Sequence, residues 1–529
     1  MLEKGSAGAG GEPAPGGASG GGILVYDIGT TSVKSAVFNA SGVPLYSASV
    51  PYNTAYPRPG WSEQDPEQFW EAAVKGTREI AAASGPGLAI DCIGLTGHMN
   101  GCLPVDAEGR PSYPELIHSD SRSGAQCARI AAAFGEESLY AATGNRTDEH
   151  LSLPKMLWLK DEQNEAFKKT AWFLNSKDYL RFKLTGVLGV TDFSDASLTG
   201  AFNIVKRSWA WDLIDALGLS GERFPEVRSG VEGGGVLSKD AAGILGLPSG
   251  IPVSVGGGDA ACATRGCGVK AAGETYLSVG SSAWASMLAD APVFDPKRRI
   301  QNFFDLDGRR CNICGTVQSA GIALDWALNI LMGGQALSSE EYRRIEAEVE
   351  KTPPGSEGVM FLPYLMGERT PHWDAAARGM FIGLSLSSGR AAMLRAVYEG
   401  ITFAFKEITD VYPDLSMPVK TFTLLGGGIR SPFWRKLICD IIGVPMLIHS
   451  FPTHAIALGA ALAAGVSVGI WDNLDAAAAA LDAAAAALEA AGGRMIPDDA
   501  EFRRYQPLFA IYQGLYHRVK PVFDELAEV

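Results

Sequence analysis

One pattern occurs twice in this sequence: a short apolar run, a turn of small and hydroxylated residues, and a second apolar run. The first copy spans residues 23–38 and the second spans residues 275–288, about 250 residues further on. Each copy predicts an antiparallel hairpin, and residues 43–50 add a third strand to the first. Because the hairpin recurs at this distance, we predict two similar domains, at residues 23–270 and 271–529, that face one another across a cleft.

The composition is that of a globular chain with a large core. The sequence has 529 residues, of which 47% are hydrophobic and 20% charged, enough for two large domains. Its formal net charge of −14 argues against nucleic-acid binding, which needs clustered Lys and Arg. A small anionic ligand is compatible with this charge, because backbone N–H groups, helix N-termini and a divalent metal can hold it.

Residues 1–22 lack the continuous apolar core of a signal peptide and predict a disordered tail. No run of 18 apolar residues indicates a membrane span. Eight Cys in a chain of this length are too few for a disulfide scaffold, which favours a reducing cytoplasm. Cys311 and Cys314 form a CxxC pair, but no second pair follows at zinc-site spacing, so buried inert thiols are favoured over a metal site.

Asp27 ends the first predicted strand, directly before the turn that contains Gly29, Thr30 and Thr31. The N–H groups and hydroxyls of such a turn can bond phosphate oxygens, and the carboxylate can hold Mg²⁺ directly or through water. A hairpin turn capped by an Asp explains the same residues equally well.

The second hairpin turn contains Gly280 and Ser281 and has the same form without the carboxylate. Alone it is more typical of a structural turn. Paired with the first hairpin, it favours a second phosphate clamp, which would need no metal ligand of its own.

A glycine run follows another predicted strand, at Gly426, Gly427 and Gly428, and a helix with Ser431 as its N-cap comes next. Adenine and ribose could lie against a backbone without side chains at a helix N-terminus. Close packing of strand and helix explains the glycines as well. Gly459 lies in a run of small residues that is as typical of helix packing as of a ligand-facing surface.

Asp259 follows three glycines at the end of a buried strand, at residues 252–255. Phosphoryl transfer to an alcohol requires a base that accepts the hydroxyl proton, and a positioned Asp can fill this role. The alternative is an Asp that caps the alanine-rich helix after it.

Two helical segments carry no predicted chemistry. Asp65 is a good N-cap, with Pro66 at the first helical position and Gln68 in place for a capping box. Residues 475–491 are alanine-rich, and we expect this helix on the outside of the second domain.

Taken in order, these motifs resemble the FGGY family of carbohydrate kinases, and most closely its xylulokinases, over about residues 23–525. The matching segments are residues 27–34 (DIGTTSVK), 61–70 (WSEQDPEQFW), 256–259 (GGGD), 277–282 (LSVGSS), 361–372 (FLPYLMGERTPH), 379–384 (GMFIGL), 396–400 (AVYEG) and 425–434 (LGGGIRSPFW). The resemblance implies two ribonuclease H-like α/β domains with mixed sheets flanked by helices. It also implies a cytoplasmic enzyme that binds a small sugar or polyol and Mg-ATP, without nucleic-acid or membrane partners, and it allows a homodimer.

By this resemblance each motif takes a role in phosphoryl transfer to a sugar. Asp259 is the general base and Asp27 the metal ligand. The ATP-binding residues are Gly29, Thr30, Thr31, Gly280, Ser281, Gly426, Gly427, Gly428, Ser431 and Gly459.

The sugar-binding positions depart from the family pattern. Xylulokinases usually have Gln-Met-His-Gly where this chain has His98, Met99, Asn100 and Gly101, and Asp-Asn where it has Asp259-Ala260. Since a lost hydrogen bond at a polyol site shifts substrate preference, we predict a pentulose or related polyol rather than D-xylulose alone. The predicted sugar-binding residues are His98, Met99, Asn100, Asp120, Arg122 and Asp259, although His98 is equally typical of a core histidine.

Several alternatives stay open at this stage. The substrate could be L-xylulose, ribulose, erythritol or gluconate, and the fold could serve a silent sugar or nucleotide sensor or a partner-coupled ATPase. The segment around Glu368 and Arg369 looks like a cleft segment, but its charges could equally form an internal structural pair, and a structural role is favoured for Arg369.

Overall fold

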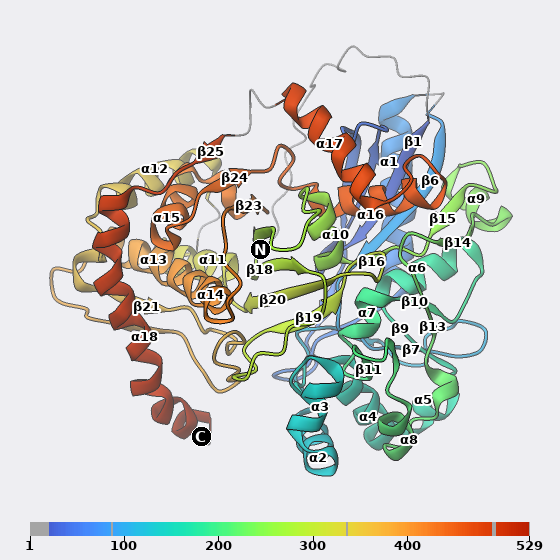
Figure 1. The fold of residues 1–529 in the computed structure, drawn as a ribbon, viewed down its shortest axis with the longest axis horizontal. Helices are drawn as coiled ribbons and strands as arrows, with labels where there is room; N and C mark the ends of the chain where they lie inside the picture. Colours follow the sequence, from blue (N-terminus) through green and yellow to red (C-terminus); the bar gives the residue numbers. More distant parts are fainter. Residues whose placement is uncertain (1–20, 86–87, 335–336, 489–492, 528–529) are drawn as a thin grey trace.

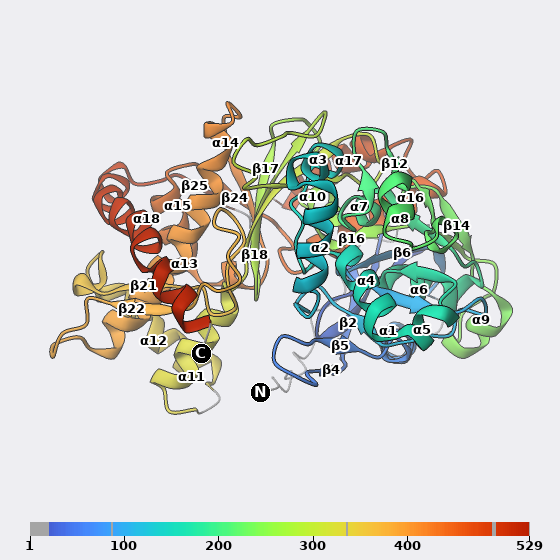
Figure 2. The ribbon, with the colours of Figure 1, turned by 90° about the horizontal axis from the view of Figure 1, so that it is seen from below.

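The computed structural model describes residues 21–85, 88–334, 337–488 and 493–527 (Figure 1). Two seven-stranded sheets lie side by side (Figures 1 and 2). Helices flank both sheets, which is the α/β architecture with mixed sheets that the sequence predicts. The predicted tail at residues 1–22 lies outside the described residues except for its last two. Within the described ranges, no helix has the length and apolar character needed to cross a membrane.

The first sheet is built around the first predicted hairpin. Its strands, in spatial order, are β14 (Gly233–Val236), β15 (Pro252–Ser254), β6 (Ile90–Gly97), β1 (Gly22–Ile28), β2 (Ser32–Phe38) and β3 (Pro44–Pro51), and β16 (Gly257–Gly258) also pairs with β6. β1, β2 and β3 are antiparallel neighbours, so the predicted meander is confirmed. β6 runs parallel to β1, and β15 and β16 run parallel to β6.

The second sheet repeats this arrangement around the second hairpin. Its strands, in spatial order, are β19 (Gln301–Phe304), β20 (Cys311–Val317), β18 (Ala283–Ala289), β17 (Thr275–Val279), β23 (Phe422–Leu425), β24 (Met446–Ile448) and β25 (Arg494–Met495). β17 and β18 are antiparallel, and β23 runs parallel to β17 as β6 does to β1. The predicted second hairpin is therefore confirmed.

Short strands outside the two main sheets form small pairs and one three-stranded sheet. These are β4 (Thr54–Ala55), β5 (Glu63–Gln64) and β8 (Glu115–Leu116); β7 (Leu103–Val105) and β9 (Trp172–Leu174); β10 (Val190–Asp192) and β13 (Glu226–Arg228); β11 (Phe202–Asn203) and β12 (Ser208–Trp209); and β21 (Met360–Leu362) and β22 (Met380–Ile382).

The helices follow in chain order. They are α1 (Glu67–Ser84), α2 (Gly124–Phe134), α3 (Glu136–Thr143), α4 (Ser152–Glu162), α5 (Asn164–Lys169), α6 (Ser176–Thr185), α7 (Phe193–Ser197), α8 (Trp211–Ala216), α9 (Lys239–Leu245), α10 (Asp259–Gly266), α11 (Gly321–Leu331), α12 (Ser339–Lys351), α13 (Arg390–Thr409), α14 (Val411–Asp414), α15 (Pro432–Ile442), α16 (Ala455–Ser467), α17 (Leu474–Leu488) and α18 (Asp499–Ala527). Short 3₁₀ turns lie at η1 (Gly221–Arg223), η2 (Ser356–Gly358) and η3 (Gly428–Arg430).

Helix α1 begins one residue later than predicted. Pro66 is its N-cap and Glu67 its first residue, while the Asp65 carboxylate accepts the N–H of Glu67. The predicted capping box does not form, because the Gln68 side chain accepts the N–H of Asn53 from the preceding loop. The helix packs on one face of the first sheet, where the Tyr26 hydroxyl meets Thr77 Oγ1 at 2.6 Å.

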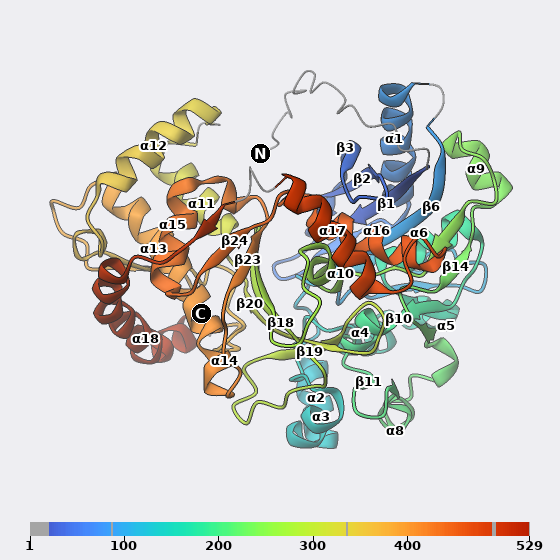
Figure 3. The same cartoon turned by 45° about the horizontal axis from the view of Figure 1, so that its top comes forward.

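The two halves of the chain exchange helices. Helix α10, which ends the first half, packs on the second sheet in a buried cluster that includes Ala263, Tyr276 and Leu425. Helices α16 and α17, from the second half, pack on the first sheet in a cluster that includes Val25 and Leu474 (Figure 3). The expectation that the alanine-rich helix lies on the outside of the second domain is therefore wrong.

Helices α10 and α16 cross in close contact. A Cβ atom added to Gly459 would lie 1.9 Å from the carbonyl oxygen of Cys262, and one added to Gly266 would lie 1.7 Å from that of Ala455. Any larger side chain at either glycine would push the two helices apart. Packing thus accounts for Gly459, and its predicted contact with ATP stays a prediction.

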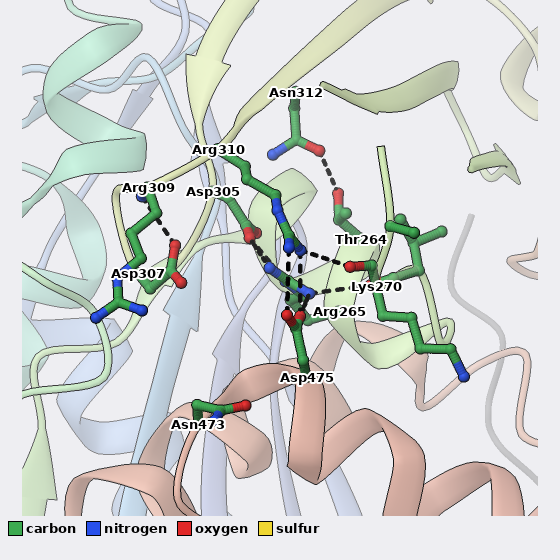
Figure 4. A network of polar contacts seen from close by, with 12 residues as sticks. Thr264, Arg265, Lys270, Asp305, Asp307, Arg309, Arg310, Asn312, Asn473 and Asp475 are labelled. Atoms are coloured by element: carbon green, nitrogen blue, oxygen red, sulfur yellow. Dashed lines mark hydrogen bonds and ion pairs between the residues drawn. The ribbon is translucent and has the colours of Figure 1, made fainter. Parts of the chain in front are cut away.

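A network of opposite charges ties this region together (Figure 4). Arg265 of α10 donates from Nε to Asp305 Oδ2 at 2.7 Å and from Nη1 to Asp475 Oδ1 at 2.8 Å. Arg310 Nη1 lies 3.2 Å from Asp475 Oδ1. The network therefore joins α10, the β19–β20 turn and the first turn of α17, and each of its charged groups has a partner of opposite sign.

Candidate active site

The site is built where parallel strands of the first sheet end at the same edge. Asp27 of β1 lies opposite Thr96 of β6, and in the next position Ile28 of β1 and Gly258 of β16 both lie opposite Gly97 of β6. The residues that follow these pairs are Gly29, His98 and Asp259. The topology thus brings the predicted metal ligand, sugar loop and general base to one edge of the sheet. In α/β proteins, ligands commonly bind at the carboxyl ends of parallel strands.

Asp259 is the first residue of α10 and is partly exposed in an otherwise buried segment. Its Oδ1 accepts the N–H of Ala260 at 2.8 Å, so the carboxylate supports the helix start. Burial, followed by the nearby Asp27 carboxylate, raises the pKa of Asp259 to about 7. A carboxylate with this pKa is suited to accept a proton near neutral pH.

The backbone before Asp259 is held by a buried polar chain. The N–H of Gly258 donates to Ser194 Oγ at 2.9 Å, and Ser194 Oγ donates in turn to Asp192 Oδ2 in a short contact. Asp192 belongs to a fully buried cluster in which Lys177 Nζ lies 2.9 Å from Asp192, 2.6 Å from Asp178 and 3.0 Å from Asp195. This scaffold fixes where the Asp259 side chain begins.

Each of the two hairpin turns is closed by a backbone hydrogen bond of its own. The N–H of Gly29 donates to Ser32 O at 3.0 Å, and the N–H of Gly280 donates to Ser282 O at 3.0 Å. The two glycines thus close their own turns. Thr31 and Ser281 are exposed and Thr30 is partly exposed, so their hydroxyls and N–H groups are the ones a phosphate could reach.

The charges around the turns connect the two domains. Asp27 is buried, and this burial raises its pKa, while Lys34, directly opposite it on β2, opposes the shift. Burial first, and then the positive charges of Lys34 and Arg430, lower the pKa of His454. The first hairpin therefore lies within electrostatic range of the segment that follows the glycine run of the second domain.

Each glycine of the run after β23 has different surroundings. Gly426 has a φ of +97°, and a Cβ there would lie 2.4 Å from the carbonyl oxygen of Val279, next to Gly280. Gly428 packs on Val279 and Trp434. Gly427 is exposed with nothing near its Cβ position, so it is the one glycine of this run that is open to a ligand.

Ser431 is the N-cap of α15, as predicted. Its hydroxyl accepts the N–H of Trp434 at 2.9 Å and donates to Glu346 Oε1 in a short contact. The side chain therefore has structural partners on both sides.

The predicted sugar loop touches the base segment directly. The Met99 side chain lies against Gly258, where an added Cβ would be 2.5 Å from its sulfur. Asn100 has a φ of +64°, and its Oδ1 is buried without a hydrogen-bond partner. His98 donates its backbone N–H to Ile28 O at 2.9 Å, but neither ring nitrogen has a partner, and burial lowers its pKa to about 4.

Asp120 and Arg122, also predicted as sugar contacts, satisfy each other. Arg122 donates from Nη2 to Asp120 Oδ2 at 2.6 Å and from Nη1 to Glu63 Oε1 at 2.7 Å, and its guanidinium stacks 3.7 Å from the Trp61 ring. The charges of Asp120 and Arg122 are therefore already matched within the protein.

Two charged residues that the sequence analysis did not single out lie below the sugar loop. Lys155 of α4 is fully buried, its Nζ donates to Asn100 O at 2.9 Å and to His150 O at 2.7 Å, and burial lowers its pKa to about 8. Glu115 is fully buried with both oxygens unpaired, 3.9 Å from His98 Nε2, and burial raises its pKa well above the ordinary value. For both Lys155 and Glu115, the sequence signal that could have predicted a buried charge was a single charged residue inside an apolar run.

The charges of Glu368 and Arg369 do not form the predicted internal pair. The Glu368 carboxylate instead accepts backbone N–H groups, from Gln318 at 2.9 Å and from Arg369 at 2.8 Å. The guanidinium of Arg369 is left without a carboxylate partner in the described part of the chain. The expectation of a structural pair is therefore wrong.

The site residues fit a magnesium ion bound together with phosphate. Burial raises the pKa of Asp27, and the charge of Asp27 helps to raise the pKa of Asp259. A cation bound at Asp27 would oppose both shifts. No cluster of three or more His, Cys, Asp or Glu side chains suited to a metal occurs among the described residues. Mg²⁺ commonly binds through one or two carboxylates plus substrate phosphates, so Asp27 together with phosphate oxygens suffices.

Comparisons with known proteins agree with the geometry. Residues 22–266 match the N-terminal domain and residues 275–468 the C-terminal domain of the FGGY family of carbohydrate kinases. A xylulose kinase of Bacillus subtilis (strain 168) is 31% identical over 94% of this chain and 97% of its own. A glycerol kinase of Gloeobacter violaceus is 31% identical over 86% of this chain and 90% of its own. The crystal structure of a xyloylose kinase from Brucella ovis has a TM-score of 0.83 and 29% identity, covering 94% of this chain and 99% of that one.

Proposed function

The chain belongs to the FGGY family of carbohydrate kinases, and from this premise we propose that it transfers the γ-phosphoryl group of ATP to a hydroxyl of a pentulose such as xylulose. The relatives named xylulose kinase, which match over nearly the whole chain, support this choice of acceptor. The glycerol kinase relative keeps other small polyols as the second candidate.

One observation carries the proposal: Asp27, the sugar loop and Asp259 meet at one sheet edge, where the loop after β6 lies between the ends of β1 and β16. Its partial exposure gives an acceptor hydroxyl access, and its pKa of about 7 leaves a large fraction ionised at neutral pH. As the new P–O bond forms, Asp259 accepts the hydroxyl proton. The hydrogen bond from the N–H of Gly258 to Ser194 Oγ holds the backbone next to Asp259 in position.

The two hairpins would hold the triphosphate. Thr30 and Thr31 of the first domain and Ser281 of the second supply hydroxyls and N–H groups from opposite sides. Gly427 leaves open backbone for the adenosine part. Asp27 would hold Mg²⁺, which when present neutralises charge on the phosphate oxygens, and Asp259 stays free to accept the proton.

The sugar would lie over His98, Met99 and Asn100. The ring nitrogens of His98 and the Oδ1 of Asn100 are buried without partners, which is costly unless a ligand or water satisfies them. Polyol hydroxyls both donate and accept, so they suit these groups.

The test is an ADP-release assay with D-xylulose, L-xylulose, ribulose, erythritol, glycerol and gluconate. We expect the highest kcat/KM with a pentulose, and Asp259→Asn should lower kcat by about 10²- to 10⁴-fold while nucleotide binding persists. Asp240→Asn, in the first turn of α9 on the surface, is the matched control and should leave kcat unchanged. Near wild-type turnover by Asp259→Asn would rule out this base, and ATP binding without ADP release for every acceptor would favour a silent sensor.

A further inference from the structure

Arg369 is a buried cation without a carboxylate partner among the residues that the structure describes. Its exposed fraction is 6%, and neither Nε nor Nη2 has a hydrogen-bond partner there. The other buried arginines have partners: Arg265 pairs with Asp305, Arg395 pairs with Glu399 at 2.8 Å, and Arg181 donates to three backbone carbonyl oxygens. Because an unpaired guanidinium is expensive to bury, Arg369 calls for a partner that the described part of the chain does not supply.

Residues 145 and 146 of the first domain contact both β19 and the segment that contains Arg369. Asn145 and Asn302 of β19 exchange hydrogen bonds, from Asn145 Nδ2 to Asn302 O and from Asn302 N to Asn145 Oδ1, both at 2.9 Å. The guanidinium of Arg146 lies 5.8 Å from the Trp373 ring. Trp373 in turn donates from Nε1 to Arg299 O at 2.9 Å, so these three segments lie together.

The charge of Arg369 acts on Asp148, which follows Arg146 in the same segment, but the two groups form no ion pair. Asp148 is bound to His150, with 2.6 Å between Oδ1 and Nδ1, and the charges of His150 and Arg369 both help to lower the pKa of Asp148. No ion pair of 4.0 Å or less joins Arg369 to a carboxylate in the described ranges. The guanidinium is therefore close to this segment but separated from it.

The same neighbours reach the sugar loop. Lys155 bridges the carbonyl oxygens of His150 and Asn100, and the His118 ring lies 6.1 Å from the ring of His98. Arg369 adds to the positive potential at His118, and both Arg369 and Asp259 act on the thiol of Cys314. The N–H of Thr316 donates to Thr370 Oγ1 at 3.3 Å, and Cys314 shares a buried cluster with Met99 of the sugar loop. Arg369, next to Thr370 in the second domain, therefore lies near the predicted sugar residues.

We propose that Arg369 is a sugar-binding residue, whose Nε–H and Nη2–H donate to hydroxyl oxygens at the end of the acceptor farthest from the phosphorylated hydroxyl. This inference rests on the proposed function. A guanidinium presents its N–H groups as a rigid fork, which suits two neighbouring oxygen atoms on one ligand. In this arrangement the second domain recognises the sugar itself as well as ATP.

The test is a double-mutant cycle between the side chain and the ligand. Arg369→Met should raise the sugar KM by about 10- to 100-fold with little change in the ATP KM, and Arg369→Lys should recover part of the loss. Wild type should discriminate strongly against an analogue that lacks the distal hydroxyl, here 1-deoxy-D-xylulose, and Arg369→Met should not. Arg378→Met, an exposed arginine that follows the same segment, is the control and should behave as wild type.

Independent, multiplicative penalties from the substitution and the missing hydroxyl would overturn the proposal. An equal rise in both KM values, reproduced by Asp148→Asn, would also overturn it and would indicate a contact between domains instead. The thermal shift that D-xylulose induces without ATP tests the contact separately from catalysis. Loss of this shift in Arg369→Met supports the contact between Arg369 and the sugar. Absence of ADP release with every acceptor would refute the proposed function but not this contact.

Discussion

Two groups of polar and charged side chains in this molecule differ in how completely they are paired. In the network of Arg265, Asp305, Arg310 and Asp475, each charged group has a partner of opposite sign (Figure 4). At and near the candidate active site, both oxygens of Glu115, Nε and Nη2 of Arg369 and both ring nitrogens of His98 lack hydrogen-bond partners among the described residues. Paired charges stabilise the arrangement of elements, whereas unpaired buried groups cost free energy that a ligand can recover. Removing a charge should therefore lower the free energy of unfolding in the paired network and raise it at the active site.

The largest effect on stability is expected in the paired network. Arg265→Met leaves the Asp305 carboxylate buried without its partner and should lower the free energy of unfolding by about 3–5 kcal/mol. Urea unfolding measures this change. Arg110→Met, which removes an exposed ion pair with Asp106, is the control and should cost at most about 1 kcal/mol. A loss as small as that of the control would remove the distinction drawn here.

The second effect is a gain of stability at the active site. The pKa of Asp259 is raised in the folded state from 3.8 to about 7, so the fold retains a proton that the unfolded chain has released between these values. Stability is therefore lost as pH rises through this window. Asp259→Asn should remove the penalty and gain on the order of 3 kcal/mol at pH 8, and almost nothing near pH 4.

Urea unfolding of wild type and Asp259→Asn at the two pH values, with a chelator and without nucleotide, measures this difference. The same change in free energy at both pH values would show that the buried carboxylate carries no such penalty.

The smallest effect is expected at the solvent-facing end of the paired network. The Asp475 side chain is 50% exposed, so water can replace its contacts with Arg265 and Arg310. Asp475→Asn should change the free energy of unfolding by about 1 kcal/mol or less. A loss of the size expected for Arg265→Met would show that the whole network acts as one unit.

Local signals predicted the elements that carry the site. The hairpins at β1–β2 and β17–β18, the strand before the glycine run and the N-cap at Ser431 are all confirmed, because turn residues and apolar runs act over a few residues. The resemblance to FGGY carbohydrate kinases is confirmed as well. For Asp259, cap and base were alternatives. The structure shows its hydrogen bond to Ala260, and the role of base stays a prediction.

Partners distant in sequence could not be predicted. An apolar face on α17 shows that the helix is buried, but not that Leu474 and Leu481 cover the first sheet. Adjacent opposite charges suggested a pair of Glu368 with Arg369, yet the backbone N–H of Gln318 competes for the carboxylate. The fate of a charged side chain depends on which groups the fold brings near it.

The exchange of helices between the two halves has a consequence for how the protein is made. A ribosome that has completed residues 1–270 has produced all the strands of the first sheet, but not α16 and α17, which cover one of its faces. The apolar side chains of Ile23, Val25 and Phe38 then stay open to water until synthesis passes residue 481. We therefore expect that neither half folds stably alone, and that a polypeptide truncated near the middle of the chain tends to aggregate.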